Sequence, residues 1–303
     1  MKIYATGSCV PPRRLTNDEL SRMVDTNDQW IVERTGIRCR HIGGEGCFPL
    51  AEQAARAALE QGGIDPARIG LVLVATFTPD RATPAAAALL QSRLGLPQDT
   101  LAFDINAACT GFLYALMTAE RLLAAMPGRL ALLVGAEAVS RTVDYTDRGT
   151  CILFGDGAGA AVVGLDGRPS AWDFGTRGND TALYTDEQNK LRMKGGEVYQ
   201  FAVRTVPPSI RSALGRAGWQ ADALDHILCH QANHRIIEAV ARHLGQPLAK
   251  FYENLAEYGN TSAASIPLAL DEMNRGGMLQ AGQKIALAGF GSGLSWGAYL
   301  FEW

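Results

Sequence analysis

The amino-acid sequence predicts a layered α/β protein made of two similar halves. Apolar strand-like runs alternate with helical ones, as is typical of sheets covered by helices. A strand, a turn and an uncharged helical stretch occur around residue 109 and recur around residue 260, each followed about 25 residues later by another apolar strand. We expect one unit to be repeated over residues 1–165 and 166–303, although chance similarity of two generic βα units would give the same pattern.

Strands are expected in the first half at 69–76, 101–106 and 130–135, where apolar residues dominate. Residues 108–117 carry no charge, and a helix that is apolar on all sides belongs deep between layers. The glycine-rich segment 154–163 is expected to turn tightly and then enter an apolar strand, because glycine allows backbone conformations that other residues avoid.

A polar, irregular segment at 165–196 is expected to join the halves. The elements of the second half then follow in order: a strand at 226–229, a helical pattern at 236–244, an uncharged helix at 263–270, a strand at 284–288 and a second glycine-rich segment at 289–297.

The composition indicates a large core and little affinity for polyanions or membranes. Of 303 residues, 47% are hydrophobic, which suffices for one large domain or two closely packed halves. The formal net charge of −3 argues against binding to nucleic acid or to a membrane surface. Residues 1–10 lack an apolar signal region, and no uncharged apolar run reaches the roughly 20 residues that span a bilayer. We expect a cytoplasmic protein.

Neither the cysteines nor the histidines form a disulfide or metal-binding pattern. The six cysteines are scattered without a CxxC pair. His230 and His234 are four residues apart, but no glutamate follows His230 as in HExxH, and no third ligand is evident. We predict no metal site.

Three residues at element boundaries are candidates for chemistry. Cys109 stands where a strand turns into a helix, and the unpaired N–H groups of a helix start lower the pKa of a thiol. His230 follows a strand and Asn260 precedes a helix, so the three are expected to converge at one end of a sheet. The repeat would relate Cys109 to Asn260. For Cys109 alone, a small buried hydrophobe is the other interpretation.

Short motifs along nearly the whole chain resemble those of one family, the β-ketoacyl-acyl carrier protein synthase III enzymes of the thiolase superfamily. The motifs are Val24-Asp-Thr-Asn-Asp-Gln-Trp-Ile31, Arg34-Thr-Gly-Ile37, Ala107-Ala-Cys-Thr-Gly111, Asp147-Arg-Gly149, Phe154-Gly-Asp-Gly-Ala-Gly159, His230-Gln-Ala-Asn233, Gly259-Asn-Thr-Ser-Ala-Ala264 and Ser295-Trp-Gly297. The resemblance implies a thiolase-like five-layer αβαβα fold of two duplicated halves, a homodimer, and a catalytic triad at Cys109, His230 and Asn260.

The resemblance also implies a condensing acyltransferase that starts fatty-acid synthesis. An acyl-CoA primer would acylate Cys109, because a thiol is both a soft nucleophile and a competent leaving group. Backbone N–H groups of Cys109 and Ser292 would hold the oxyanion. Malonyl-acyl carrier protein would then lose CO2, while neutral His230 and the Asn260 amide donate to the enolate oxygen. No cofactor is implied, since coenzyme A enters as part of the substrate.

Further positions match substrate-binding residues of the family. Trp30 and Arg148 resemble a pair that holds the adenine of coenzyme A between them. Arg235 matches a basic position that docks the acidic carrier protein, although a solvated helix charge is equally consistent. The other positions implied are Thr26, Arg34, Gly149, Ala232 and Asn233 for coenzyme A, and Phe154 and Thr83 for the acyl pocket.

Two departures from the family pattern concern the substrate. Thr83 stands where acetyl-selective relatives often carry a bulky aromatic residue across the dimer interface, so we predict tolerance of acyl chains longer than acetyl. The junction between Gly164 and Gly195 is shorter than usual and Gly196 replaces an expected asparagine, which puts contacts from this region in doubt.

Four other functions compete with this assignment. A papain-like cysteine hydrolase uses Cys, His and Asn but lacks the duplication. A thiolase needs a second cysteine near the C-terminal glycine-rich segment, and residues 286–303 contain none. A condensing enzyme of secondary metabolism, of the quinolone-forming or polyketide-priming type, keeps the same triad and is not separated by the sequence. A non-enzymatic acyl-binding or scaffolding protein is disfavoured because all three triad positions hold competent residues.

Overall fold

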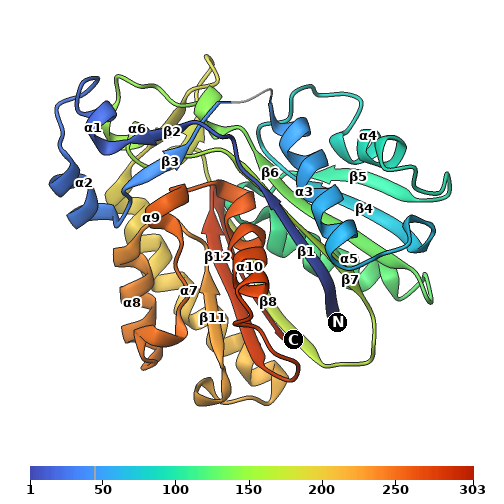
Figure 1. Cartoon of the computed structure of the whole chain (residues 1–303). Coiled ribbons are helices and arrows are strands. Elements are labelled where there is room, and N and C mark those ends of the chain that lie inside the picture. The colour runs from blue at the N-terminus through green and yellow to red at the C-terminus, as the bar shows by residue number, and fades with distance from the viewer. Residues whose placement is uncertain (44–45) are drawn as a thin grey trace.

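Two β-sheets with matching strand order form the framework of the fold (Figure 1). The computed structural model describes residues 1–43 and 46–303. The first sheet has the order β1-β7-β6-β4-β5, with strands β1 (Lys2–Cys9), β4 (Ile69–Ala75), β5 (Leu101–Ile105), β6 (Leu130–Glu137) and β7 (Gly157–Gly164). The second has the order β8-β13-β12-β11, with strands β8 (Ser170–Asn179), β11 (His226–Cys229), β12 (Lys284–Gly291) and β13 (Gly293–Glu302).

The two sheets repeat one pattern of pairing. In the first, β1 and β6 both pair antiparallel with β7, and β6 pairs parallel with β4. In the second, β8 and β12 both pair antiparallel with β13, and β12 pairs parallel with β11. The counterpart of β5 is reduced to one parallel bridge between Ile227 and Phe251. The expected duplication of the fold is confirmed, while the boundary at residue 165, which falls between β7 and β8, stays a prediction.

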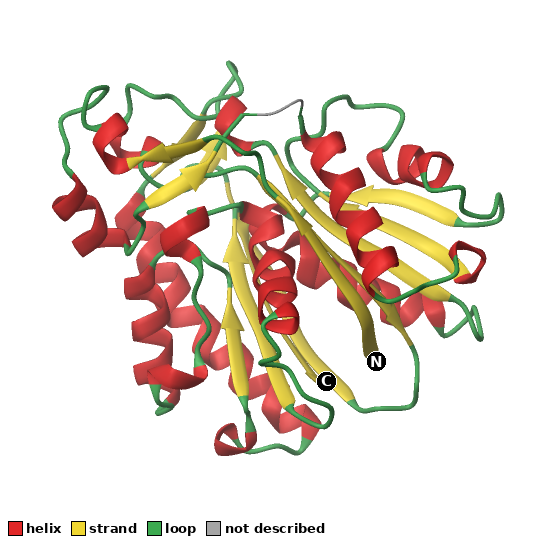
Figure 2. Cartoon of the chain, in the orientation of Figure 1, coloured by secondary structure: helices red, strands yellow, loops and turns green. Residues whose placement is uncertain are grey.

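Helices lie outside both sheets and also between them (Figures 1 and 2). The central helices α5 and α10 contact strands of both sheets. Helices α3 and α4 cover the outer face of the first sheet, and α7 and α8 cover that of the second. The order of helix, sheet, helix, sheet, helix is the expected five-layer αβαβα fold. The bounds are α3 (Cys47–Gln61), α4 (Ala86–Arg93), α5 (Gly111–Leu123), α7 (Gly195–Ala217), α8 (His234–Leu244) and α10 (Ser265–Arg275).

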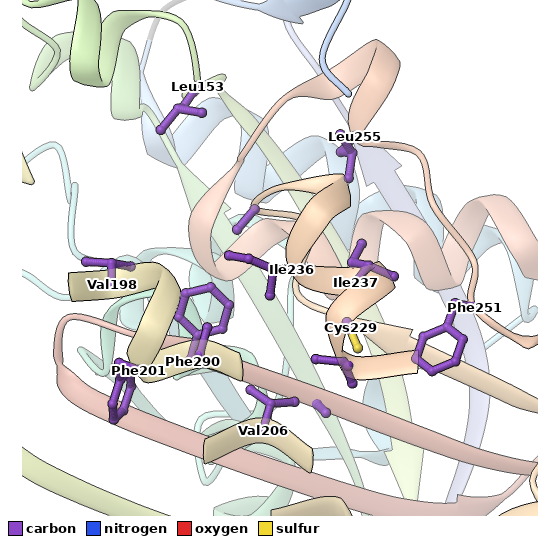
Figure 3. Close-up of a cluster of buried hydrophobic side chains, with 14 of the residues drawn as sticks. Leu153, Val198, Phe201, Val206, Cys229, Ile236, Ile237, Phe251, Leu255 and Phe290 are labelled. Carbon is purple, nitrogen blue, oxygen red and sulfur yellow. The ribbon is translucent and has the colours of Figure 1, made fainter. Parts of the chain in front are cut away.

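Three clusters of buried side chains fill the spaces between the five layers. Figure 3 shows part of the cluster outside the second sheet, to which Val198 and Phe201 of α7, Ile236 and Ile237 of α8, and Phe290 of β12 belong. Val198, Ile236 and Phe290 also line the main cavity described below. This outer core therefore forms one wall of the candidate site.

The expected strands and helices are found, but the expectation that residues 165–196 are irregular is wrong. This segment holds the ten-residue strand β8 and a small hairpin of β9 (Leu183–Thr185) and β10 (Leu191–Met193). Because β8 pairs only with β13, it is an edge strand and is partly exposed along most of its length. A strand of this kind shows no continuous apolar run in the sequence.

Short elements gather at one end of the sheets, at the upper left of Figure 1. They are β2 (Arg14–Thr16), β3 (Cys39–His41), α1 (Asn17–Leu20), α2 (Asp28–Thr35), α6 (Arg148–Cys151) and α9 (Leu255–Tyr258). They supply part of the rim of the site. No helix in the described part of the chain is long and apolar enough to cross a membrane.

Candidate active site

The side chains of Cys109, His230 and Asn260 line one cavity of about 520 Å³. All three are buried, with exposed fractions of 8%, 2% and 6%. Cys109 follows β5 of the first sheet, His230 follows β11 of the second, and Asn260 precedes α10. The structure thus brings together three residues that lie far apart in the sequence and come from both halves.

Cys109 lies in a single 3-10 turn, Ala108–Thr110, and α5 begins two residues later at Gly111. The loop after β12 passes directly against this turn. A Cβ atom added to Gly291 would lie 3.0 Å from the backbone nitrogen of Cys109. A side chain at position 291 would therefore crowd the turn, and its absence lets the loop of residues 291–293 border the thiol.

Burial controls the protonation of the Cys109 thiol. It raises the pKa of Cys109 to about 12, which outweighs the lowering by a hydrogen bond with the Ser262 hydroxyl, and the negative charge of Glu137 adds to the increase. The expectation that the helix start lowers this pKa is wrong, because taking a thiolate out of water costs more than the nearby donors return. Cys109 is a neutral thiol at rest, so its proton must leave as the sulfur attacks.

His230 is held as a neutral ring by burial, which lowers its pKa to about 3. Its Nδ1 lies 2.6 Å from the Ser265 hydroxyl, so Nε2 is the ring nitrogen left to face the cavity. The ring also packs edge-to-face against Phe290, with centroids 5.5 Å apart. A neutral imidazole in this position suits a hydrogen-bond donor better than a general base.

Asn260 is fixed by its backbone and by its side-chain oxygen. Its backbone forms a parallel bridge with Phe154, in which the Asn260 N–H donates to Leu153 O at 2.8 Å. Its Oδ1 accepts a hydrogen bond from the N–H of Ser262 at 2.8 Å. Because Oδ1 is occupied, the Nδ2 donor is the end of the amide available to the cavity.

The internal repeat relates Asn260 to Asn106 and not to Cys109. Each asparagine Oδ1 accepts a hydrogen bond from the N–H two residues later, at 2.8 Å and 3.2 Å. That later residue has positive φ in both halves, 51° and 46°, and opens the 3-10 turn before a central helix. In this register Cys109 corresponds to Ala263. The expected relation between Cys109 and Asn260 is thus wrong by three residues, and only one half carries a nucleophile.

A second cavity of about 150 Å³ meets Cys109 from another side and is also lined by Phe154, Leu183, Leu191 and Ser292. Phe154 lines both cavities, as do Cys109 and Leu183. Outside the bonds within helices and strands, no hydrogen bond from the backbone N–H of Cys109 or Ser292 to an oxygen is found in the described part of the chain. Both donors are therefore available to a ligand atom near the sulfur.

Most of the predicted coenzyme A positions lie on the wall of the main cavity. Asn233 also has a structural function, because its Oδ1 accepts the N–H of Arg235 at 2.9 Å and caps α8. Its Nδ2 donates to Arg34 O at 3.0 Å and ties α8 to the end of α2. The predicted positions found on this wall are Trp30, Arg34, Gly149, Ala232, Asn233 and Arg235.

Thr26, Arg148 and Thr83 are not among the described residues that line these two cavities. Arg148 and Arg34 lie 4.9 Å and 4.8 Å from the centroid of the Trp30 ring. A base held between Trp30 and Arg148 therefore requires the arginine to swing away. Thr26 has a buried hydroxyl without a hydrogen-bond partner, and Thr83 lies in an exposed loop.

The segment that departs from the family pattern does reach the site. Leu183, Met193, Gly195 and Gly196 all line the main cavity. A Cβ atom at Gly196 would meet no atom within 4 Å, so the first turn of α7 has room for a side chain there. The short segment therefore does contact the main cavity, although it has glycine at position 196 where the family pattern has asparagine.

Three residues near the triad were missed by sequence reasoning: Glu137, Ser262 and Ser265. Ser265 contacts His230, and Ser262 contacts both Asn260 and Glu137. One signal was present, since Glu137 is a charged residue directly after the apolar run 130–136. The two serines carry no signal of their own, because serine is common at helix starts.

The His230 and His234 side chains do not form a pair. His234 lies 2.8 Å from Glu253 and 3.4 Å from Glu238, while His230 contacts Ser265. Within residues 1–43 and 46–303, no group of three or more His, Cys, Asp or Glu side chains is placed to hold a metal ion.

A duplicated five-layer fold with cysteine, histidine and asparagine around one cavity defines a thiolase-fold condensing enzyme. Residues 103–178 match the family model for 3-oxoacyl-[acyl-carrier-protein (ACP)] synthase III, and residues 214–303 match the model for its C-terminal part. The β-ketoacyl-[acyl-carrier-protein] synthase III of Clostridium acetobutylicum is 42% identical over 321 residues, which cover 100% of this chain and 98% of that protein. This chain belongs to the β-ketoacyl-[acyl-carrier-protein] synthase III family.

Solved structures agree with this membership. The 3-oxoacyl-[acyl-carrier-protein] synthase III of Aquifex aeolicus VF5 has a TM-score of 0.96 at 41% identity, covering 100% of this chain and 99% of that one. The priming β-ketosynthase of the R1128 polyketide biosynthetic pathway has a TM-score of 0.92 at 35% identity, covering 99% and 95%. The relative named for a polyketide pathway is thus similar but more distant.

Proposed function

We propose that this protein condenses an acyl-CoA primer with malonyl-acyl carrier protein, with loss of CO2, and so starts fatty-acid synthesis. The observation that carries the proposal is the single cavity lined by Cys109, His230 and Asn260. The names of the relatives, synthases that act with an acyl carrier protein, support the same reaction. The product is a β-ketoacyl thioester on the carrier protein.

In the first half-reaction, the Cys109 sulfur attacks the thioester carbonyl of acyl-CoA. The backbone N–H groups of Cys109 and Ser292 donate to the oxygen that becomes negative. Their lack of an internal oxygen acceptor supports this assignment. The second cavity, which Phe154 also lines, takes the acyl chain.

In the second half-reaction, the malonyl thioester loses CO2 and its carbonyl oxygen takes the negative charge of an enolate. His230 Nε2 and Asn260 Nδ2 donate to that oxygen, which stabilises charge that exists only near the transition state. The contacts of Ser265 to Nδ1 and of Ser262 to Oδ1 support this, because they leave both donors toward the cavity.

Coenzyme A is proposed to enter along the rim formed by α2, α6 and the start of α8. Trp30 and Arg148 hold the adenine after Arg148 moves, and Arg34 meets the phosphates. The buried, unpartnered hydroxyl of Thr26 supports a contact there. Gly149, Ala232 and Asn233 are proposed as further contacts, and Arg235 as the docking point of the acidic carrier protein.

We further propose a cytoplasmic homodimer that accepts primers longer than acetyl. The open edge of β5 supports a two-fold contact, and the exposed loop of Thr83 would reach the acyl pocket of the second copy. A threonine there leaves volume for additional methylenes. Steady-state rates with acetyl-, butyryl- and octanoyl-CoA test the chain length, and a sharp preference for acetyl-CoA would refute it.

The central experiment is mass measurement of the purified protein after incubation with acyl-CoA. We expect one acyl group on Cys109, which is lost in Cys109→Ala and retained in the control Cys47→Ala, another buried cysteine. Absence of stable acylation would favour a hydrolase or a non-catalytic acyl-binding protein. Turnover with malonyl-acyl carrier protein against malonyl-CoA, with product analysis, separates this function from a quinolone- or polyketide-priming one.

A further inference from the structure

A buried pair of hydroxyls joins the two sides of the acylation site, and the reaction above assigns it no part. Thr110 directly follows the nucleophile, and Ser295 lies in β13, three residues after Ser292. Their exposed fractions are 0% and 4%, and Thr110 Oγ1 lies 2.9 Å from Ser295 Oγ. Within the described residues, no other hydrogen bond joins the turn of residues 108–110 to the loop of residues 291–295. The contact therefore links a turn of the first half to a loop of the second.

Each hydroxyl is also bound to the backbone on its own side. Thr110 Oγ1 donates to the carbonyl of Ala107, the residue before the turn, at 2.7 Å. Ser295 Oγ donates to Ser292 O at 3.0 Å. The two hydroxyls carry two hydrogens for three contacts, so one hydrogen bridges two oxygens. A continuous chain of hydrogen bonds thus runs from Ala107 O through both hydroxyls to Ser292 O.

The loop that carries Ser292 has few side chains to hold it against the turn. Gly291 and Gly293 flank Ser292, and Gly293 has a φ of 136°, a conformation that other residues rarely adopt. A Cβ atom at Gly291 would lie 3.3 Å from the backbone nitrogen of Thr110, so the loop runs directly against the turn. The Ser292 hydroxyl donates to Leu183 O of β9 at 2.5 Å. Hydrogen bonds to Ser292, more than side-chain packing, therefore set its position.

The two donors proposed for the oxyanion come from different halves of the molecule. Because the N–H groups of Cys109 and Ser292 lie far apart in the sequence, local backbone geometry does not fix their spacing. An oxyanion hole works only if both nitrogens lie about 2.7–3.1 Å from the position of the negative oxygen. Thr110 is bonded to the residue of the first donor, and Ser295 holds the residue of the second. The hydroxyl contact is therefore placed to set the distance between the two donors.

We infer that Thr110 and Ser295 act together as positioning residues that fix the spacing of the two oxyanion donors. The inference rests on the proposed function. Neither residue is among the described residues that line the two cavities, so the pair acts through the N–H groups. As the Cys109 sulfur bonds to the acyl carbon, the carbonyl oxygen takes an electron pair and returns it when the bond to the coenzyme A sulfur breaks. Coenzyme A leaves as a thiol and the acyl group replaces the hydrogen of Cys109, so no other reactant is consumed.

The test compares two reactions of the same thiol. Acylation by butyryl-CoA forms an oxyanion, whereas alkylation by iodoacetamide displaces iodide from a CH2 carbon and forms none. Both reactions need the thiol to lose its proton, so the ratio of their rate constants isolates the oxyanion. In Ser295→Ala, the single-turnover acylation rate constant at saturating butyryl-CoA should fall roughly 10- to 100-fold, because one donor is misplaced. The alkylation rate constant should change less than about twofold, since no donor is needed.

The two hydroxyls should behave as one unit. Thr110→Val removes the other hydroxyl at nearly the same side-chain volume and should lower the acylation-to-alkylation ratio as well. The double variant Thr110→Val/Ser295→Ala should be no slower than the slower single variant, because residues that share one contact are not additive. Ser295→Thr keeps a hydroxyl and should keep the ratio within a few-fold of the wild type.

Ser209→Ala is the matched control. Ser209 is an equally buried serine of α7, 3% exposed, whose hydroxyl donates to Asp173 O at 3.2 Å, and neither of these residues lines the two cavities. This variant should keep the wild-type ratio. If Ser295→Ala does not fold, the ratio in Thr110→Val decides.

An unchanged ratio in Ser295→Ala or Thr110→Val, or effects that multiply in the double variant, would overturn the inference and leave the proposed function intact. A wild type that iodoacetamide alkylates but butyryl-CoA does not acylate would overturn the proposed function itself.

Discussion

At the scale of single residues, burial rather than the helix start sets the chemistry of this site. It keeps Cys109 as a thiol and His230 as a neutral ring, with pKa values of about 12 and about 3. The two shifts have one cause, since both charged forms lose their hydration. The histidine is thereby suited to donate to an enolate, and the cysteine needs a route for its proton.

Removing either enolate donor should slow decarboxylation and spare acylation. Asn260→Asp keeps the Oδ1 acceptor for Ser262 but replaces the Nδ2 donor with a negative oxygen, and His230→Ala removes Nε2. We expect CO2 release from malonyl-acyl carrier protein to fall on the order of 10²–10³-fold in each. Acyl transfer to Cys109 should change less than about tenfold, because the backbone donors remain.

The control is His234→Ala, which alters a neighbouring histidine that contacts Glu238 and Glu253 instead of the triad. CO2 release by this variant should stay within a few-fold of the wild type. If Asn260→Asp slowed acylation as much as decarboxylation, the assignment of its amide to the enolate step would be wrong.

The buried Glu137 should make stability depend on pH in an unusual direction. Its pKa rises from 4.5 to about 7 on folding, so the folded state binds the proton more tightly than the unfolded chain. The resulting stabilisation is fully present below pH 4.5 and is lost as pH rises through about 7. At 1.36 kcal/mol per pKa unit, the loss is on the order of 3 kcal/mol.

Urea unfolding of the wild type and of Glu137→Gln at pH 5 and pH 8 measures this effect. The difference in free energy of unfolding between the two proteins should shift by about 3 kcal/mol in favour of the glutamine variant at the higher pH. Because all other titrating groups are shared, they cancel in this difference. Parallel stability curves would contradict the raised pKa of Glu137.

At the scale of elements, the start of α8 both orders the fold and borders the substrate cavity. Asn233→Ala removes the N-cap and should cost about 1 kcal/mol of stability, seen as a lower Tm. Asn233→Asp keeps the cap acceptor and removes the donor to Arg34 O. It should keep most of the Tm yet raise the KM for acyl-CoA, because α2 is no longer tied to α8. An unchanged KM in both variants would exclude Asn233 from coenzyme A binding.

Strands with continuous apolar runs were predictable from the sequence, and the half-exposed edge strand was not. The strands β4 and β6 are entirely buried and stand out as apolar runs. The edge strand β8 is not, and its polar residues resemble a loop. Similarly, Cys109, His230 and Asn260 were predictable because each stands at an element boundary. The link from Ser262 to Glu137 joins residues 125 positions apart and left no local pattern.

At the scale of the whole molecule, duplication explains why the site has its chemistry in one place only. Both halves place an asparagine before a central helix with the same side-chain bond to the following turn. Only the first half follows it with a cysteine, and only the second presents a histidine after its parallel strand. The two halves must therefore pack together through α5 and α10 before a nucleophile and its enolate donors share a cavity.

The whole molecule also has one sheet edge that a second copy would cover. Strand β5 pairs with β4 on one side only, and Leu101 at its start is 41% exposed. An isologous contact between two β5 strands would satisfy the open backbone groups and bury Leu101 of both copies.

We therefore expect a stable dimer by sedimentation equilibrium. Leu101→Glu should raise its Kd by roughly 10- to 100-fold, because each of the two leucine side chains, 41% exposed in the monomer, loses about 1 kcal/mol of burial. The matched control is Leu165→Glu, which changes an equally exposed leucine between β7 and β8, 43% exposed, and should leave the Kd unchanged. A monomeric wild type, or equal effects of the two substitutions, would show that β5 is not the dimer interface.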